Sequence, residues 1–135
     1  MISSKIDELL SIILISSRFF TNTLDAAPEF MTDLLKYMHS SYDKKITLEQ
    51  LSQLSGFSKP HLIRLFNKYV GCSPKEYIIR LRVDRSKRLL EETTLPTSTI
   101  CSMVGIDDSS YFCALFKKRT GYTPYQYRLS HHRQH

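Results

Sequence analysis

A pattern that occurs twice constrains the fold of this chain more than any other sequence feature. The motif G-x-[ST]-P-x-x-Y spans residues 71–77 and returns 50 residues later at 121–127. A phenylalanine stands five residues before the glycine of each motif: Phe66 before Gly71 and Phe116 before Gly121. A repeat of this length indicates a supersecondary unit that is present twice.

The first copy has the signals of a helix-turn-helix unit. Thr47 is placed to cap a short helix over 48–55, and Gly56 can end it because glycine reaches a left-handed backbone at little cost. Ser58 is the expected cap of a second helix over 59–70. Strand signals are nearly absent, because no apolar–polar alternation is sustained. The side chains of Leu48, Leu51 and Leu54 in the short helix are expected to point into the core.

The second copy follows the same plan. Gly105 is expected to end its short helix, and Asp107 or Asp108 to cap a helix over about 109–120. Helix-turn-helix units are therefore predicted at about 47–70 and 97–120.

Equivalent positions of the two copies hold small side chains, Ser52 and Cys101. Two helices that cross closely at such a position accept only a small residue. Both residues stand next to the apolar anchor of their short helix.

A segment of about 20 residues, 74–93, joins the copies and contains no helix breaker after Pro74. At about 1.5 Å per residue, a helix of this length is about 30 Å long. Successive major grooves on one face of B-DNA are about 34 Å apart, so this linker helix is expected to hold two recognition helices in step with them. Its predicted apolar positions are Tyr77, Ile78, Leu81, Val83, Leu89 and Leu90, and its basic ones are Lys75, Arg80, Arg82, Arg85, Lys87 and Arg88.

Residues 1–28 form a leader, with a helix expected over 3–20 and a linker over 22–28. The apolar face of the helix is wide, so the helix is expected to be buried. It can pack on a sensor domain, on a second copy of the chain or on its own DNA-binding domain, and the sequence leaves these three open. The next helix, over 29–42, is predicted to carry an apolar stripe of Phe30, Leu34, Leu35, Met38 and Tyr42.

Charge divides the chain unevenly. Residues 1–31 carry two basic and four acidic side chains, or −2, whereas residues 32–135 carry 17 and nine, or +8. A basic domain indicates a polyanionic partner such as nucleic acid. The uncharged run 9–17 is too short for a membrane span, which needs about 20 apolar residues.

No metal or cofactor is expected from the sequence. Three cysteines without C-x-x-C spacing fit neither a disulfide framework nor a zinc site, and we expect them to be buried or half-buried thiols. Glycine-rich nucleotide-binding motifs do not occur.

Several stretches of both copies carry a family resemblance, namely residues 58–66, 71–74, 80–90, 104–112, 116–118 and 121–128. Over about residues 32–128 the chain resembles the DNA-binding domain of the AraC/XylS family of bacterial transcription regulators. The resemblance implies an all-α domain of seven helices. Its two helix-turn-helix units are then expected to bind double-stranded promoter DNA and to contact RNA polymerase.

The resemblance also implies where this domain belongs in a longer protein. Residues 29–135 are expected to follow a sensor and dimerisation domain that binds a small-molecule effector, with residues 1–28 as the end of that domain. The full-length protein is then a cytoplasmic homodimer without a membrane segment. A short stand-alone regulator is the alternative.

The first recognition helix is expected to bury Leu62, Leu65 and Phe66 and to present its other side to DNA. Arg64 is our first choice for a base contact, because a guanidinium can bind guanine O6 and N7 together. Asn67 or Lys68 is expected to contact phosphate. The full predicted set is Lys59, Pro60, Ile63, Arg64, Asn67 and Lys68, with His61 at its edge and apolar contacts from Pro60 and Ile63.

The second recognition helix is expected to bury Phe112, Leu115 and Phe116. Family members often have Arg or Lys where this chain has Ala114, and a Phe where it has Ile106. We therefore expect the first unit to specify the DNA sequence and the second to contribute mostly phosphate contacts. The predicted set is Ser109, Ser110, Cys113, Ala114, Lys117 and Lys118, with phosphate contacts from Ser109, Lys117 and Lys118.

Other classes of function fit the sequence less well. An enzyme would need converging catalytic groups, whereas Glu91-Glu92 indicates a solvated helix end and His131, His132 and His135 a frayed tail. RNA-binding modules display aromatic side chains for stacking, whereas the phenylalanines here are assigned to the core. A helix-turn-helix module that binds proteins without DNA specificity remains the alternative.

Overall fold

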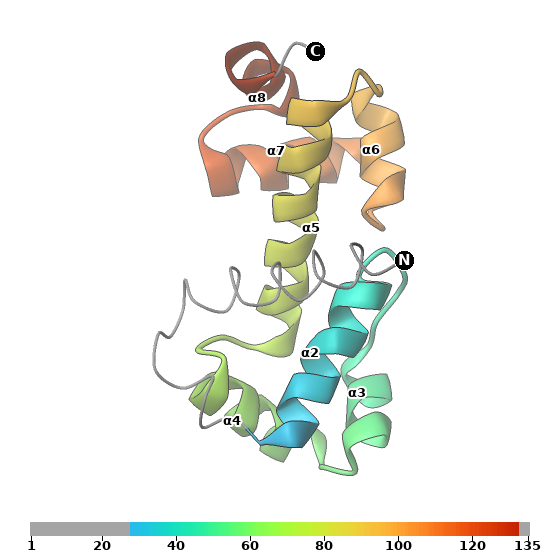
Figure 1. Ribbon diagram of the computed structural model, residues 1–135, viewed down its shortest axis with the longest axis vertical. Coiled ribbons are helices and arrows are strands. Elements are labelled where there is room, and N and C mark those ends of the chain that lie inside the picture. The colour runs from blue at the N-terminus through green and yellow to red at the C-terminus, as the bar shows by residue number, and fades with distance from the viewer. Residues whose placement is uncertain (1–27, 133–135) are drawn as a thin grey trace. The chain divides into compact units, whose positions relative to one another are not determined.

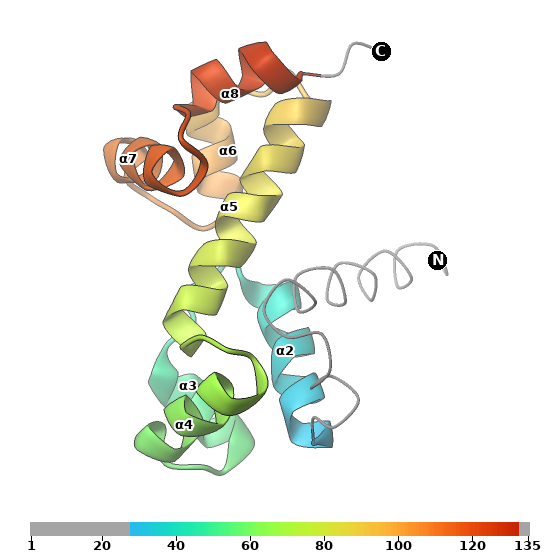
Figure 2. The same cartoon turned by 90° about the vertical axis from the view of Figure 1, so that its left-hand side faces the viewer.

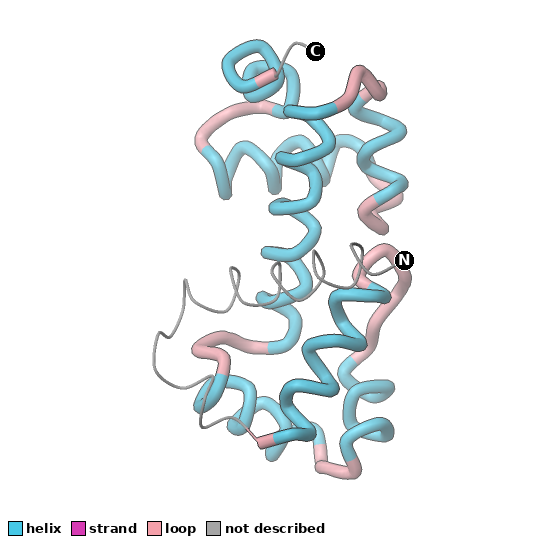
Figure 3. The backbone as a smooth tube through the Cα atoms, viewed as in Figure 1, coloured by secondary structure: helices cyan, strands magenta, loops and turns pink. Residues whose placement is uncertain are grey.

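The computed structural model describes residues 28–132, which form seven helices and no strand (Figures 1 and 3). This confirms the predicted all-α class. The predicted helix over 3–20, the linker up to residue 27 and His135 lie outside the described residues. The helices are α2 (Glu29–Ser41), α3 (Leu48–Ser55), α4 (Lys59–Tyr69), α5 (Pro74–Glu92), α6 (Thr97–Met103), α7 (Ser109–Thr120) and α8 (Pro124–His131).

The chain divides into two compact units. Among the described residues, the first unit comprises 28–41 and 46–78, and the second comprises 42–45 and 79–132. Helix α5 is continuous through the boundary at residue 78, as Figure 2 shows. The first helix-turn-helix, α3–α4, and the second, α6–α7, therefore belong to different units.

In the first unit α2 packs on α3, and α3 packs on α4. Leu34, Leu35 and Met38 of α2 are buried as predicted, but the stripe also includes Met31, which the sequence interpretation missed. Phe30 is only half-buried, with its ring 4.8 Å from that of Phe57 between centroids. The remaining buried apolar side chains of this unit are Leu51, Leu62, Phe66, Val70, Cys72, Tyr77 and Ile78.

One predicted inward position of the first unit is wrong. Leu54 is 59% exposed, whereas Leu51 is 1% exposed and Leu48 is half-buried. Residues three apart on an α-helix differ by about 60° in direction, so Leu48 and Leu54 point about 120° apart. A neighbouring helix that covers only a narrow strip of this short helix therefore buries the middle leucine, Leu51, and leaves the outer two more exposed.

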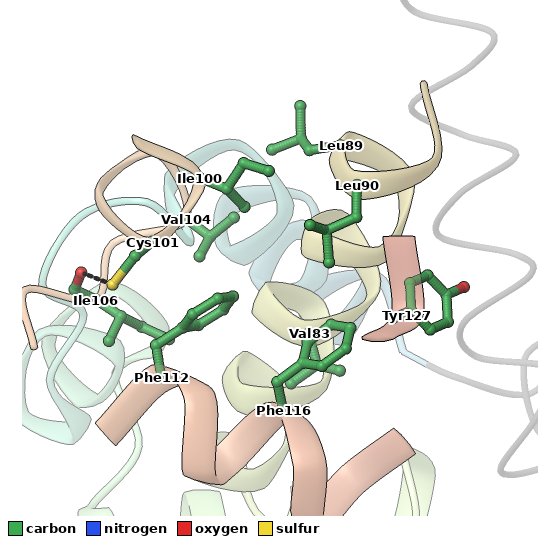
Figure 4. Packing of buried hydrophobic residues seen from close by; sticks show 10 residues of the cluster. All are labelled: Val83, Leu89, Leu90, Ile100, Cys101, Val104, Ile106, Phe112, Phe116 and Tyr127. Atoms are coloured by element: carbon green, nitrogen blue, oxygen red, sulfur yellow. Dashed lines mark hydrogen bonds between the residues drawn. The ribbon is translucent and has the colours of Figure 1, made fainter. Parts of the chain in front are cut away.

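The core of the second unit lies among α5, α6, α7 and α8 (Figure 4). Phe112 and Phe116 point from α7 into this core and are fully buried, as predicted. Ile106, which stands where the family usually has Phe, is buried as well. Tyr42 packs against this second core and not in the stripe of α2. The complete cluster is Val83, Leu89, Leu90, Ile100, Cys101, Val104, Ile106, Phe112, Phe116 and Tyr127.

Side-chain caps fix where most of these helices begin. The Thr47 and Thr123 side chains each accept a hydrogen bond from the backbone of the third helical residue, in a capping box. The Ser58 side chain caps α4 by accepting from the His61 backbone, without a return bond, and Asp108 rather than Asp107 caps α7. The predicted helix starts are confirmed at Thr47, Ser58 and Asp108.

Helix α5 is one residue shorter than the predicted range 74–93 and buries the predicted apolar side chains. It also buries Ser86 completely, and the Ser86 hydroxyl donates to the Arg82 carbonyl. Among the described residues, no helix has the length and apolar character that crossing a membrane requires.

Candidate nucleic-acid interface

The outer face of α4 presents five of its predicted DNA-contacting side chains to solvent. Lys59 and Pro60 are exposed in the first turn, directly after the Ser58 cap. Arg64 is exposed one turn further on, where it forms no hydrogen bond or ion pair with any described residue. Asn67 and Lys68 are exposed as well. A free guanidinium on such a face can donate to base edges or to phosphates.

Other side chains of this face are partly engaged within the protein. The Lys59 ammonium forms an exposed ion pair with Glu49 of α3. The Asn67 side-chain nitrogen donates to the Ile63 carbonyl at 3.0 Å, and the Lys68 ammonium lies 5.2 Å from the Tyr69 ring centroid. Exposed pairs of this kind contribute little to stability, so these groups remain available to a strongly anionic ligand.

His61 and Ile63 are less accessible than the rest of this set. Both are half-buried, and the His61 ring packs edge-on against Phe57 with 4.9 Å between centroids. His61 therefore supports the turn of the first helix-turn-helix, as its predicted position at the edge of the face allows.

The outer face of α7 has a different character. The Asp108 carboxylate accepts hydrogen bonds from the backbone of Ser110 at 2.9 Å and of Tyr111 at 3.2 Å. Ser109, Ser110 and Ala114 are exposed, so the first half of this helix presents small neutral side chains beside acidic ones. Its positive charges come at the end, where the exposed Lys117, Lys118 and Arg119 occupy the last turn.

Two residues of α7 differ from the sequence interpretation. Cys113 is half-buried and packs against the second core, because it directly follows the fully buried Phe112 on the edge of the buried face. It therefore lies at the edge of the predicted face and is less accessible than Ser109, Ser110 and Ala114. Tyr111 is 53% exposed in the first turn of the helix, and the sequence interpretation gave it no role. Its place between the cap Asp108 and Phe112 is the signal that could have identified it.

A short segment from elsewhere in the chain lies against the turn of the second helix-turn-helix. Tyr42–Lys45 connects α2 to α3 but belongs to the second unit. The Arg82 guanidinium of α5 donates from Nε to the Tyr42 carbonyl at 2.8 Å and from Nη2 to the Lys44 carbonyl at 3.0 Å. A Cβ atom added to Gly105, in the turn, would lie 2.8 Å from the Asp43 carbonyl oxygen. The sequence interpretation missed this contact, because the partners are 38 or more positions apart.

The end of the described chain is packed and not frayed, which corrects the prediction for His131 and His132. The His131 ring stacks on Tyr127 with 4.1 Å between centroids, and His132 Nε2 lies 3.1 Å from the Thr93 carbonyl oxygen. Glu91 also differs from the predicted solvated surface, because its carboxylate accepts a hydrogen bond from the Tyr127 hydroxyl at 2.8 Å. Burial and this contact raise the pKa of the Tyr127 hydroxyl.

The cysteines are free thiols, with Cys72 and Cys101 buried and Cys113 half-buried, as expected. Among residues 28–132, no group of three or more His, Cys, Asp or Glu side chains is placed to hold a metal ion.

Comparison with known proteins identifies the family to which the chain belongs. A model of a helix-turn-helix domain matches residues 51–130, which span both helix-turn-helix units. This chain belongs to the AraC-type helix-turn-helix family. Members of this family are DNA-binding regulators of transcription, so the transcription-related part of the sequence prediction is confirmed at this level.

Individual relatives support the same assignment. The chain is 35% identical to the bifunctional transcriptional activator/DNA repair enzyme AdaA of Bacillus subtilis, covering 80% of this chain and 51% of that protein. It is 31% identical to the lactose operon transcription activator of Staphylococcus xylosus, covering 85% of this chain and 40% of that one. The chain thus spans about half, or less, of the length of these relatives.

A solved structure matches over nearly its whole length. It is the C-terminal domain of the two-component response regulator yesN from Fusobacterium nucleatum, with a TM-score of 0.72 and 31% sequence identity. The match covers 75% of this chain and 99% of that domain.

Proposed function

We propose that this AraC-type chain is the part of a bacterial transcription regulator that binds promoter DNA in a sequence-specific manner. It reads two successive major-groove segments of the duplex with α4 and α7. It acts by binding, and we assign no catalytic role to any of residues 28–132. The observation that carries the proposal is the exposed outer face of α4, on which Arg64 is free of partners within the described protein.

In this proposal the two units divide the work. Arg64 binds a base edge through its guanidinium, and Pro60 and Ile63 offer apolar contact to a thymine methyl group. Lys59, Asn67 and Lys68 contact the backbone of the same half-site. His61 holds the turn through its contact with Phe57.

The second unit then contributes mainly phosphate contacts. Lys117 and Lys118 in the last turn of α7 supply positive charge, and Ser109 and Ser110 at its start supply neutral donors. Ala114 can provide only van der Waals contact. Cys113 is assigned a lesser part than the sequence alone gave it, because it is half-buried.

The wider setting follows the same proposal. Residues 29–135 form the DNA-binding domain, and residues 1–28 are the end of a sensor and dimerisation domain that responds to a small-molecule effector. The full-length protein works in the bacterial cytoplasm as a homodimer and contacts RNA polymerase. The share of the relatives that this chain spans supports the existence of a further domain.

Selection of binding sites from a random duplex library tests the proposal. The chain should enrich one sequence, and its affinity should fall steeply between 50 and 200 mM salt, because phosphate neutralisation releases counterions. Arg64→Ala should cost about 1–3 kcal/mol and relax specificity at one position of one half-site. Lys36→Ala is the matched control, because Lys36 is an exposed cation on α2.

Two outcomes would count against the proposal. Failure to enrich any sequence, with no salt-dependent binding, would favour a protein-interaction module. Equal losses on every sequence after Arg64→Ala would show that Arg64 contacts only phosphate.

A further inference from the structure

The segment Tyr42–Lys45 is held in one place by contacts on two sides. Arg82 binds the carbonyls of Tyr42 and Lys44, and the Asp43 backbone lies directly over Gly105. Two hydrogen bonds from one guanidinium fix the direction of the backbone between the two accepting carbonyls. These contacts position the backbone of the segment, although it lies outside both helix-turn-helix units.

The neighbours of Arg82 show which part of the second unit this segment faces. Burial lowers the pKa of Arg82, and the carboxylates of Asp43 and Asp107 and the hydroxyl of Tyr111 oppose this effect, so these groups lie near the guanidinium. Tyr111 is in the first turn of α7, and Asp107 precedes that helix. The anchored segment thus lies beside the N-terminal end of the second recognition helix.

The N-terminal end of α7 is negatively charged, which disfavours contact with the phosphates of DNA. Asp107 and Asp108 are both exposed, and within residues 105–114 no Lys or Arg accompanies them. In helix-turn-helix complexes the N-terminal residues of the recognition helix reach the base edges, so the groups beside them come near the phosphates that border the groove. These two carboxylates and the exposed Asp43 of the anchored segment repel phosphate unless nearby cations offset them.

The anchored segment supplies such cations. Lys44 and Lys45 are exposed, and neither ammonium group forms an ion pair or hydrogen bond with any described residue. The backbone that carries them is fixed, while their side chains are free. This is the arrangement that a phosphate contact needs, because only the side-chain conformation has to be ordered on binding.

We infer that Lys44 and Lys45 form a phosphate-binding site of the second half of the DNA interface, presented by the Arg82-anchored segment and separate from both helix-turn-helix units. The inference rests on the proposed function, since it names residues of the same DNA-binding surface. The positive charges beside the start of α7 thus come from lysines about 60 residues earlier in the chain.

Replacing both lysines by glutamine tests this site. Lys44→Gln/Lys45→Gln should weaken binding to the selected duplex on the order of tenfold at 150 mM salt and reduce the slope of log K against log salt by about 1 to 2. Lys36→Gln/Lys75→Gln is the matched control, because it removes two exposed lysines from α2 and the start of α5. The control should leave the slope unchanged.

Phosphate ethylation interference locates the effect. The Lys44→Gln/Lys45→Gln variant should lose interference at one or two phosphates of a single half-site, and Arg64→Ala should change the other half-site. Arg82→Gln should weaken binding in the wild-type background and have little further effect in the double-lysine variant. If Arg82→Gln does not fold, the two lysine variants decide the question by themselves, because their side chains have no partner within the described residues.

The two levels of the proposal fail differently. Wild-type protein that binds duplex DNA, together with a double-lysine variant of unchanged slope and interference pattern, would overturn the inference alone. Wild-type protein that binds no duplex would overturn the proposed function as well.

Discussion

The two helix-turn-helix units of this chain share their internal contacts and differ on their exposed faces. In the first unit the Ser52 hydroxyl donates to the Phe57 carbonyl, and in the second the Cys101 thiol donates to the Ile106 carbonyl at 2.8 Å. Figure 4 marks the second of these bonds. A hydroxyl and a thiol thus serve the same purpose, which is to bind the turn to the short helix. The comparison shows which positions folding itself requires.

The exposed faces have no such correspondence. α4 begins with Lys59 and carries the exposed Arg64, whereas α7 follows Asp107 and Asp108 and has Ala114 in the matching position. Because neither face contributes much buried area, folding places little constraint on the residues there. Differences between the copies on this surface therefore point to different contacts with the ligand.

The largest expected effect tests whether the two cores are equally necessary. Phe66→Ala and Phe116→Ala each remove a fully buried ring and should each lower the free energy of unfolding by about 3–5 kcal/mol. Tyr111→Ala, at a half-exposed position, should cost less than about 1 kcal/mol. Urea unfolding followed by circular dichroism measures all three. A loss near zero for either phenylalanine would mean that its unit does not depend on that core.

The next comparison concerns the two turn glycines. Both have a left-handed backbone, with φ of 78° at Gly56 and 87° at Gly105. Gly56→Ala meets no atom within 4 Å and should cost about 1 kcal/mol. Gly105→Ala should cost about 2–4 kcal/mol, because its Cβ would also press on the Asp43 backbone. Equal losses of stability in the two variants would contradict the close packing of residues 42–45 on the second turn.

The third comparison is between the tyrosines that follow the two helix-turn-helix units, Tyr77 and Tyr127. The Tyr77 hydroxyl lies 2.8 Å from His39 Nε2, whereas the Tyr127 hydroxyl donates to a carboxylate. Burial lowers the pKa of His39 from 6.5 to about 4, so the unfolded chain binds a proton between these pH values that the folded chain does not. Stability should therefore fall as the pH is lowered from 6.5 towards 4, by about 2 kcal/mol after allowance for the partial exposure of the ring.

The measurement is urea unfolding at pH 7.5 and at pH 4.5, with His39→Gln as the variant that lacks the titrating group. Wild-type protein should lose more stability between these pH values than His39→Gln does. The same loss in both proteins would assign the pH dependence to other groups.

The smallest expected effect concerns the face of α7. Ala114→Arg places a guanidinium at the position that corresponds to Arg64, and Ala114 is exposed, so the thermal midpoint should stay within about a degree. Binding to the selected duplex should tighten by about 1 kcal/mol or shift its preference at one position of the second half-site. Fluorescence anisotropy with a panel of duplexes measures this. Weaker binding to every duplex would show that the face of α7 does not enter the groove.

The sequence determined the helices of this protein because their limits depend on near neighbours. A cap such as Thr47 or Ser58 bonds to a backbone group three residues away, so the signal is complete within one turn. The burial of Phe112 and Phe116 was also predictable, since four-residue spacing places both on the same side of a helix. Arg64 and Ala114 fell on the opposite side for the same reason.

Only the tertiary structure decided how far each helix face is buried, because burial depends on which other element covers that face and how much of it. Leu54 has the spacing of a core residue but is exposed, and Cys113 has the spacing of an outer residue but is half-buried. The sequence predicted a frayed end at His131 and His132, whereas His131 stacks on Tyr127 and His132 contacts the Thr93 carbonyl. The contact of Arg82 with residues 42–45 is the clearest instance. Periodicity describes one helix at a time, whereas such contacts join residues that only the folded chain brings together.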